Sequence, residues 1–239
     1  MIFIGDVHGH IERYRKIIRA LPEGARSLQL GDMGLGFRGV RLFPGGSLAR
    51  GLHRFIRGNH DDPARCRKHP LYLGDYGYLP EEQLFYLGGA WSIDKSWRTP
   101  LVSWWPDEEL DYGELDAAYQ LYVKSKPQIV ATHEAPSKAA FKMLEFLTTG
   151  KHAPSPTDQN VRLKGDEYAY YKAKLGCVNT RTSQALQRMF EEHQPVHFFY
   201  GHYHADVDFD LGLTHFHCLN ELSCAELTLK DGVYEVHRL

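Results

Sequence analysis

Short apolar runs alternate with polar loops along most of the chain. Five of these runs end directly in a loop that carries Asp, Asn or His. The five runs are residues 2–4, 27–30, 54–56, 129–131 and 197–200. Runs of this length, bounded by glycine and polar residues, are typical of buried strands. We therefore predict five short strands, each followed by a loop that bears metal-binding or catalytic side-chain types.

Segments with helical periodicity lie between the predicted strands. The first amphipathic stripe comprises Ile11, Tyr14, Ile17, Ile18 and Leu21, and it ends at Pro22 and Gly24. A second helix is predicted to open at Asp111 or Tyr112 and to run through Lys124, with a buried stripe of Leu115, Ala118, Tyr119 and Tyr122. A third contains Ala185, Leu186, Met189 and Phe190, and a short helix is expected from about residue 62.

The remaining segments are predicted to be strands and loops. Residues 71–105 are rich in Tyr, Gly and Trp and predict short strands with a loop, and residues 149–167 predict a long surface loop. Asp231 and Gly232 predict a hairpin turn in the tail. We expect loops 35–51, 91–113 and 135–168 to select the substrate, although their sequences do not show which substrate.

Composition indicates one soluble α/β domain over residues 1–239. The chain is 43% apolar and 24% charged, without an internal repeat or a domain linker. The amino terminus lacks the pattern of a signal peptide, and no apolar stretch approaches the roughly 18 residues that span a bilayer. The four cysteines show no C-x-x-C spacing, which favours reduced thiols, with a Cys218–Cys224 disulfide as the alternative. We expect a cytoplasmic protein without a membrane partner.

Charge is unevenly distributed. Residues 1–70 carry 13 Lys and Arg against 6 Asp and Glu, while the remainder carries 15 against 24. This asymmetry fits either chance clustering on solvated helix faces or an electropositive half that attracts an anionic substrate. The net charge of −2 does not indicate nucleic acid as a partner, although a small polynucleotide end remains compatible with the positive half.

The side chains after the five strands suit a metal centre. Ligands of an open α/β sheet bind beyond the carboxyl ends of its strands, so these side chains can converge at one sheet edge. They form a mixed nitrogen and oxygen ligand set for two divalent ions: Asp6, His8, Asp32, Asn59, His133, His202 and His204. Asp32 is the natural candidate to bridge two ions. His60 follows Asn59 directly and points elsewhere, so it can deliver a proton while Asn59 holds a metal.

These loops resemble those of a known family. GDVHG, GDMG, GNHD, THE and GHYH occur in this order between residues 5 and 204, and the chain thereby resembles the calcineurin-like metallophosphoesterases. The resemblance implies a four-layer αββα sandwich. It also implies one metal on Asp6, His8 and His204 and another on Asn59, His133 and His202, with Asp32 shared. His60 would be the general acid, kept charged and oriented by Asp61.

Further patterns bear on the branch of the family. The block RGNHD resembles the protein Ser/Thr phosphatases, yet MGLG replaces the Asp-Arg pair that follows the second Gly-Asp in that branch. GHYH resembles instead the members that cleave nucleotides and diesters. GGAWSIDKSWR followed by SWWPDEE resembles small bacterial and phage members.

The sequence therefore predicts a hydrolase that acts on a phosphomonoester through two metal ions and a metal-bound hydroxide. Manganese is the favoured metal, with Fe, Zn, Ni or Mg as alternatives. Arg57 is expected either to contact the phosphate or to pair with a surface acid, and Arg38, Arg41 and Arg98 are weaker candidates. Glu134 is expected to tune His133. The alternatives are a phosphodiesterase or nuclease and a non-catalytic scaffold; the oligomeric state is open.

Overall fold

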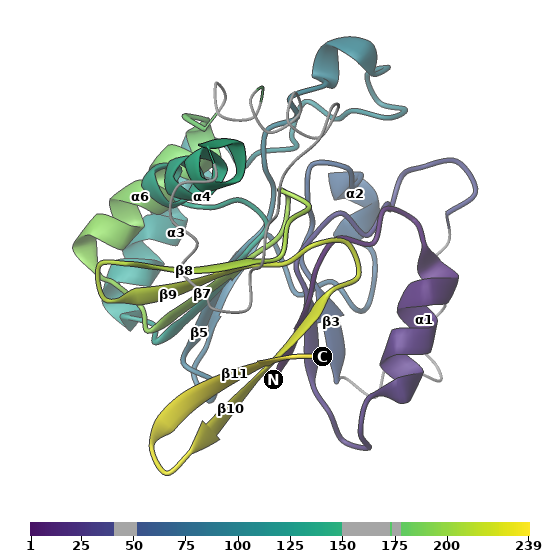
Figure 1. Cartoon of the computed structure of the whole chain (residues 1–239). Coiled ribbons are helices and arrows are strands. Elements are labelled where there is room, and N and C mark those ends of the chain that lie inside the picture. Colours follow the sequence, from purple (N-terminus) through teal and green to yellow (C-terminus); the bar gives the residue numbers. More distant parts are fainter. Residues whose placement is uncertain (41–51, 150–172, 174–177) are drawn as a thin grey trace.

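Two β-sheets lie face to face between layers of helices in the computed structural model, which describes residues 1–40, 52–149, 173 and 178–239 (Figure 1). The first sheet has the order β11-β10-β1-β2-β3, formed by β1 (Ile2–Ile4), β2 (Ser27–Gln29), β3 (His53–Phe55), β10 (Cys224–Lys230) and β11 (Val233–Arg238). The second has the order β4-β5-β6-β7-β9-β8, formed by β4 (Tyr76–Leu79), β5 (Leu84–Leu87), β6 (Ile129–Thr132), β7 (His197–Tyr200), β8 (Val207–Leu211) and β9 (Thr214–Cys218).

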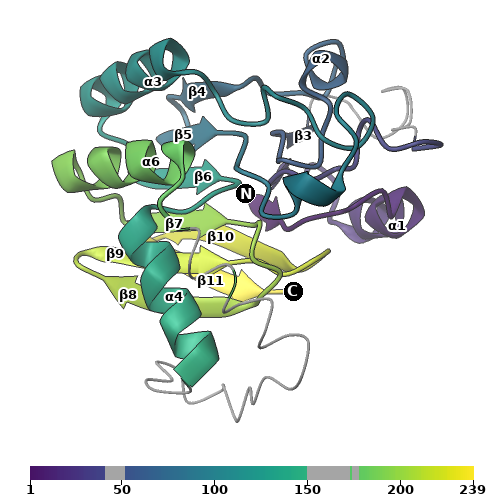
Figure 2. The ribbon, with the colours of Figure 1, turned by 90° about the horizontal axis from the view of Figure 1, so that it is seen from above.

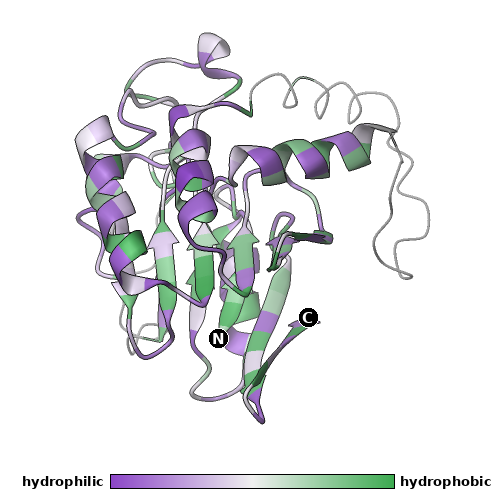
Figure 3. Cartoon of the chain, turned by 90° about the vertical axis from the view of Figure 1, so that its left-hand side faces the viewer, coloured by the Kyte–Doolittle hydropathy of each residue, from purple (hydrophilic) through white to green (hydrophobic). Residues whose placement is uncertain are grey.

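Helices cover the outer face of each sheet. The first sheet is flanked by α1 (Ile11–Ala20) and α2 (Pro63–Cys66), and the second by α3 (Tyr112–Ser125), α4 (Ser137–Thr149) and α6 (Arg181–Glu192). Figure 2 shows the four layers edge on, and Figure 3 shows mainly hydrophobic strands beside helices banded with hydrophilic residues. The architecture is the predicted α/β, four-layer αββα sandwich.

The alternation of side chains along β1 explains this layering. Ile2 and Ile4 belong to the apolar cluster that faces α1, while Phe3 belongs to the cluster between the sheets. The Phe3 ring stacks on Phe199 of the second sheet, with centroids 4.0 Å apart. Because both faces of β1 are covered, the strand is apolar throughout, as is usual for strands buried on both sides.

The five predicted strands are confirmed, but they do not share one sheet edge. The first three form β1, β2 and β3 of the first sheet, while the last two form β6 and β7 of the second. In each set the strands are parallel, so their carboxyl ends point the same way. Hydrophobic runs do not reveal pairing partners, which is why the single-edge expectation was wrong.

Most predicted helices and turns are confirmed. The helix α1 buries Ile11, Tyr14 and Ile18. A capping box between Asp111 and Glu114 opens α3. The tail hairpin turns through Asp231 and Gly232, with φ angles of 51° and 80°.

The short helix expected from about residue 62 is the four-residue α2. One expectation needs correction, because α4 lies inside the segment 135–168 that we expected to be a loop. The buried stripe of α4 is Ala139, Ala140, Met143, Leu144 and Leu147. Residues 41–51 and 150–168 of the expected substrate loops lie outside the described residues.

Cysteine and membrane expectations can also be compared with the structure. Cys66, Cys218 and Cys224 are free thiols, so the alternative Cys218–Cys224 disulfide is not formed. Among the residues that the structure describes, no helix is both long enough and apolar enough to cross a bilayer.

Candidate metal centre

The structure brings the seven predicted ligands together at the carboxyl ends of β1, β2, β6 and β7 and in the loop after β3. The residues form two groups, and within each group the ligand atoms all lie within 4.8 Å of one another. The first group is Asp6, His8, Asp32 and His204, and the second is Asp32, His133 and His202. Asn59 joins the second group, because its Oδ1 is 3.1 Å from His133 Nε2. Asp32 belongs to both groups, which is the position a bridging carboxylate requires.

Several contacts show that this donor set fits divalent cations. Asp6 Oδ2 is buried and has no hydrogen-bond partner among the described residues, although His204 Nε2 is 3.2 Å away. His8 Nε2 and His204 Nε2 face each other at 2.9 Å. Imidazole nitrogens and carboxylate oxygens directed at one point are ligands for transition metals such as Mn, Fe and Zn.

The electrostatic field at the site favours positive charge. Burial opposes ionisation of His8 and His133, but the adjacent Asp6 and Asp32 carboxylates raise the pKa of each imidazole to about 9. Burial likewise opposes the charge on Asp32, yet His133, His60 and His8 hold its pKa well below the ordinary value. Two buried carboxylates that stabilise nearby cations provide the environment in which a divalent ion binds.

Four of the seven predicted ligands have left-handed backbone conformations. The φ angles are 46° at His8, 55° at Asp32, 67° at His202 and 51° at His204. A non-glycine residue rarely adopts this conformation, and such strain occurs at functional sites where the surrounding structure enforces it. The backbone N–H of His8 donates to the backbone carbonyl of Asp32 at 2.7 Å, so the strained turns at these two residues hold each other in place.

Two glycines of the motifs make room for ligand side chains from neighbouring loops. A Cβ at Gly58 would overlap Asp32 Oδ1, and a Cβ at Gly201 would overlap Asp6 Oδ1. Each glycine therefore makes room for a ligand from another loop. A side chain at Gly58 or Gly201 would displace the carboxylate of Asp32 or Asp6 from the centre.

Asp61 connects two of the loops. Its carboxylate accepts hydrogen bonds from four backbone N–H groups, those of Met33, Gly34, Leu35 and Gly58. Asp61 was expected to orient His60, but these four bonds direct it to the backbone instead. It therefore fixes the loop of Asp32 against the loop of Asn59.

The comparison with known families agrees with this geometry. A sequence model described as calcineurin-like phosphoesterase matches residues 1–206. The chain belongs to the calcineurin-like phosphoesterases. No curated protein sequence matches it.

A solved structure shares the fold of this phosphoesterase. It is a Staphylococcus aureus protein described as a candidate 5'-nucleotidase in complex with alpha-ketoglutarate, with a TM-score of 0.51 and 13% identity. The superposition covers 99% of this chain and 52% of that protein, so the chain spans about half the length of its neighbour.

His60 lies at the rim of the centre in this phosphoesterase. Its side chain is 22% exposed, and its backbone N–H donates to Asp32 Oδ1 at 2.7 Å. Its Nε2 contacts the guanidinium of Arg98, and because an arginine can only donate, Nε2 is the acceptor in this contact. Burial and Arg98 lower the pKa of His60 to about 4, against the opposing effect of Asp32. The contact and the lowered pKa both favour the neutral imidazole over the charged form that we expected.

Arg57 has no exposed surface and cannot contact a bound phosphate in this conformation. Its Nε donates to Asp75 Oδ1 at 2.6 Å, and its Nη1 donates to the carbonyls of Asp107 and Glu108 at 3.0 and 2.6 Å. Of the two expectations for Arg57, pairing with an acid is the one that the structure shows. We do not retain the phosphate contact.

Sequence reasoning missed the residues that orient Asn59. Asn59 Nδ2 donates to Ser92 Oγ at 3.0 Å, which turns Oδ1 toward His133. Ser92 in turn donates from Oγ to Glu108 Oε2 at 2.5 Å. Both belong to the patterns GGAWSIDKSWR and SWWPDEE, which were the available signal.

Glu134 lies beside a second predicted ligand. It accepts from the Tyr203 hydroxyl, and its Oε2 is 3.7 Å from His202 Nε2. The expected effect of Glu134 on His133 stays a prediction.

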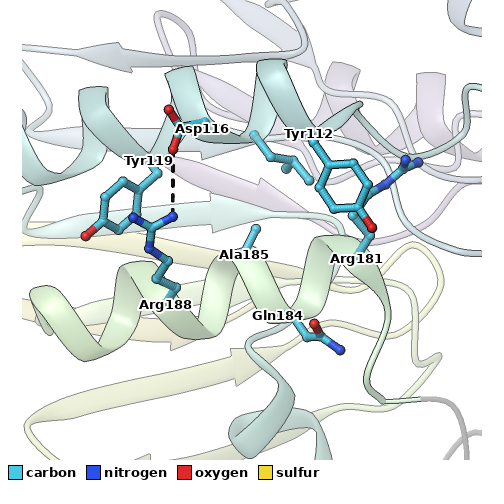
Figure 4. A pocket seen from close by; sticks show the side chains of 8 residues that line it. Tyr112, Asp116, Tyr119, Arg181, Gln184, Ala185 and Arg188 are labelled. Carbon is cyan, nitrogen blue, oxygen red and sulfur yellow. Dashed lines mark ion pairs between the residues drawn. The ribbon is translucent and has the colours of Figure 1, made fainter.

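A surface hollow of about 420 Å³ lies apart from these residues, between α3 and α6 (Figure 4). It is lined by Tyr112, Leu115, Asp116, Tyr119, Arg181, Gln184, Ala185 and Arg188. None of the predicted site residues lines it.

Proposed function

We propose that this calcineurin-like phosphoesterase hydrolyses phosphomonoesters at a centre of two divalent metal ions, with manganese as the native metal. The observation that carries the proposal is the pair of ligand groups that share Asp32. Two groups with one common carboxylate are the arrangement that holds a pair of ions. Fe, Zn, Ni and Mg are the alternative metals for the same ligands.

The ligands divide into two sets. Asp6, His8 and His204 would hold one ion, Asn59, His133 and His202 the other, and Asp32 both. When bound, the ions would supply Lewis acidity toward a phosphate oxygen and lower the pKa of a coordinated water. Ser92 keeps the Asn59 amide oxygen directed at the centre. Asp61 holds the loop that carries Asp32 against the loop that carries Asn59.

His60 is the group that we propose protonates the leaving group. It is partly exposed, lies beside Asp32 and is not one of the ligands, so a departing alkoxide can reach it. Its Nε2 accepts from Arg98 in this structure, so it would have to bind a proton from solvent before it could donate, and a substrate that replaces the contact with Arg98 would allow this. General acids of this kind contribute roughly 10²–10⁴-fold to a rate.

Two observations bear on the ester class. The neighbouring structure is described as a candidate 5'-nucleotidase, which favours a monoester such as a nucleotide, although it shares only the fold with this chain. His204, the second histidine of GHYH, lies in the first ligand group, and this pattern resembles members that cleave diesters. A phosphodiesterase or nuclease is therefore the second candidate.

The test is hydrolysis of p-nitrophenyl phosphate and bis-p-nitrophenyl phosphate by protein stripped of metal and reloaded with Mn²⁺. We expect metal-dependent turnover of the monoester. Turnover of the diester alone would replace the proposal with the second candidate, and salt dependence on oligonucleotides would then identify a nuclease. A protein that binds Mn²⁺ and cleaves neither ester would be a scaffold.

A further inference from the structure

The segment 92–108, here called the arm, projects beyond the ends of the strands (Figure 1, teal). Its two ends are tied together, because Ser92 N and Oγ both donate to the Glu108 carboxylate, at 2.9 and 2.5 Å. These joined ends also contact the core of the protein: Ser92 accepts a hydrogen bond from Asn59, and the Glu108 carbonyl accepts one from Arg57. The base of the arm is therefore rigidly connected to a metal ligand.

The arm exposes large apolar side chains and covers most of an arginine side chain, which is the reverse of the usual preference. Trp97 and Leu101 are 89% and 73% exposed, whereas the Arg98 side chain is only 9% exposed. Large apolar groups are usually buried and arginines usually exposed, and covering a cation costs free energy unless it is paired. The arm thus directs Arg98 inward to the metal centre, while its other cation, Lys95, is exposed.

Three contacts hold the Arg98 guanidinium in place. Nη2 donates to Asp94 Oδ2 at 2.6 Å and contacts His60 Nε2, while Nη1 donates to the carbonyl of Ser103 at 3.3 Å. Asp94 is 36% exposed, so water weakens its ion pair with Arg98. The Ser103 bond is long. The guanidinium is therefore poised at His60 by contacts that an anion can replace.

We propose that Arg98 binds the phosphoryl group of the substrate beside His60 and thereby selects dianionic monoesters over monoanionic diesters. This inference rests on the proposed function and adds a substrate-binding residue outside the five motif loops. The planar guanidinium donates two parallel hydrogen bonds to phosphate oxygens. A phosphate monoester carries most of a second negative charge at neutral pH, because its second pKa is about 6. A phosphate diester carries a single negative charge and has no second charge for Arg98 to pair with.

The sequence offers a matched control for Arg98. Lys95 is a cation on the same arm, exposed and stacked over Trp91 with Nζ 4.8 Å from the ring centroid. Removing it changes the net charge of the arm as Arg98→Ala does, without changing the contact with His60.

The experiment compares Arg98→Ala, Arg98→Lys and Lys95→Ala with the parent protein, each loaded with Mn²⁺ and checked for metal content. One readout is kcat/KM for p-nitrophenyl phosphate and for bis-p-nitrophenyl phosphate. The other is the Kd of inorganic phosphate measured by calorimetry. We expect Arg98→Ala to lower monoester kcat/KM and to weaken phosphate binding, each by roughly tenfold or more, as for other charged hydrogen bonds. Diester turnover should fall by less than about threefold, since a diester lacks the charge that Arg98 matches. Arg98→Lys should be intermediate and Lys95→Ala unchanged.

Equal losses on both esters with an unchanged phosphate Kd would overturn the inference, because Arg98 would then act only by positioning His60. An Arg98→Ala protein with unchanged monoester kcat/KM would also overturn it. If the parent protein cleaves neither ester, the proposed function fails separately, and the phosphate Kd still reports on Arg98. If Arg98→Ala does not fold, Arg98→Lys supplies the same comparison.

Discussion

Asp32 is the side chain on which both ligand groups depend. It is almost fully buried, and its carboxylate lies 3.4 Å from His133 Nε2 and 3.8 Å from His8 Nε2. Its Oδ1 also accepts the backbone N–H of His60. A single substitution at Asp32 therefore tests metal binding in both ligand groups at once.

Asp32→Asn is expected to remove bound metal and activity together. The amide keeps an oxygen that can accept the His60 N–H, but it loses the negative charge that two cations share. Metal analysis of purified protein and the rate with p-nitrophenyl phosphate measure the effect. Asp116→Asn, at an exposed aspartate between α3 and α6, serves as the control. An Asp32→Asn protein that is fully metallated and active would refute the bridging role.

His60→Ala is expected to reduce turnover far more for an alkyl phosphate than for p-nitrophenyl phosphate. A good leaving group such as nitrophenolate departs without a proton, whereas an alkoxide needs a general acid, which contributes roughly 10²–10⁴-fold. Rates with both substrates at equal metal content give the comparison. Similar losses on the two substrates would eliminate His60 as the acid.

The helix α3 shows how local sequence can define a complete element. Asp111 Oδ1 accepts from Glu114 N at 2.8 Å, and Glu114 Oε2 accepts from Asp111 N at 2.9 Å. The helix α4 was missed, although its small and apolar residues recur at helical spacing after Pro136. The polar residues from 149 onward led us to treat the whole segment as a loop.

Asp111→Ala is expected to destabilise the protein by about 1 kcal/mol, because the first turn of α3 loses a hydrogen-bond acceptor. For a chain of this size that corresponds to a decrease of roughly 2–4 °C in Tm. Thermal unfolding followed by circular dichroism measures it, and activity per bound metal should not change. Asp116→Ala lies on the same helix, 61% exposed, and should leave Tm nearly unchanged. Equal effects of the two variants would argue against the cap.

The metal centre also connects the two sheets. Asp6 and Asp32 follow β1 and β2 of the first sheet, while His133 and His202 lie in the loops at the ends of β6 and β7 of the second. Between the sheets lies an apolar core that includes the Phe3–Phe199 stack. Metal ions held by residues of both sheets would stabilise the folded chain as a whole.

Mn²⁺ is therefore expected to raise Tm relative to chelator-treated protein. At a free concentration of 100 times Kd the stabilisation is about 2.7 kcal/mol, which corresponds to roughly 5–10 °C here. Thermal unfolding in EDTA and in excess Mn²⁺ measures the shift, and Asp32→Asn should abolish it. Bound metal without a change in Tm would show that the ions do not link the sheets.

Local sequence determined the five strands that precede the motif loops, the helices α1, α2, α3 and α6, and the chemistry of the seven predicted ligands. Periodicity reports which side of an element is buried, and the type of a side chain fixes which metal or proton it can hold. These properties belong to residues close together in the chain, so no tertiary information is needed to recognise them.

Only the tertiary structure decided how these parts are used. It divided the strands between two sheets, buried Arg57 against Asp75, turned Asp61 toward four backbone amides and placed Arg98 at His60. Each of these depends on contacts between residues distant in sequence. Arg57 and Arg98 have the same side chain, and what distinguishes them is which anions, carbonyls and solvent surround each guanidinium after folding.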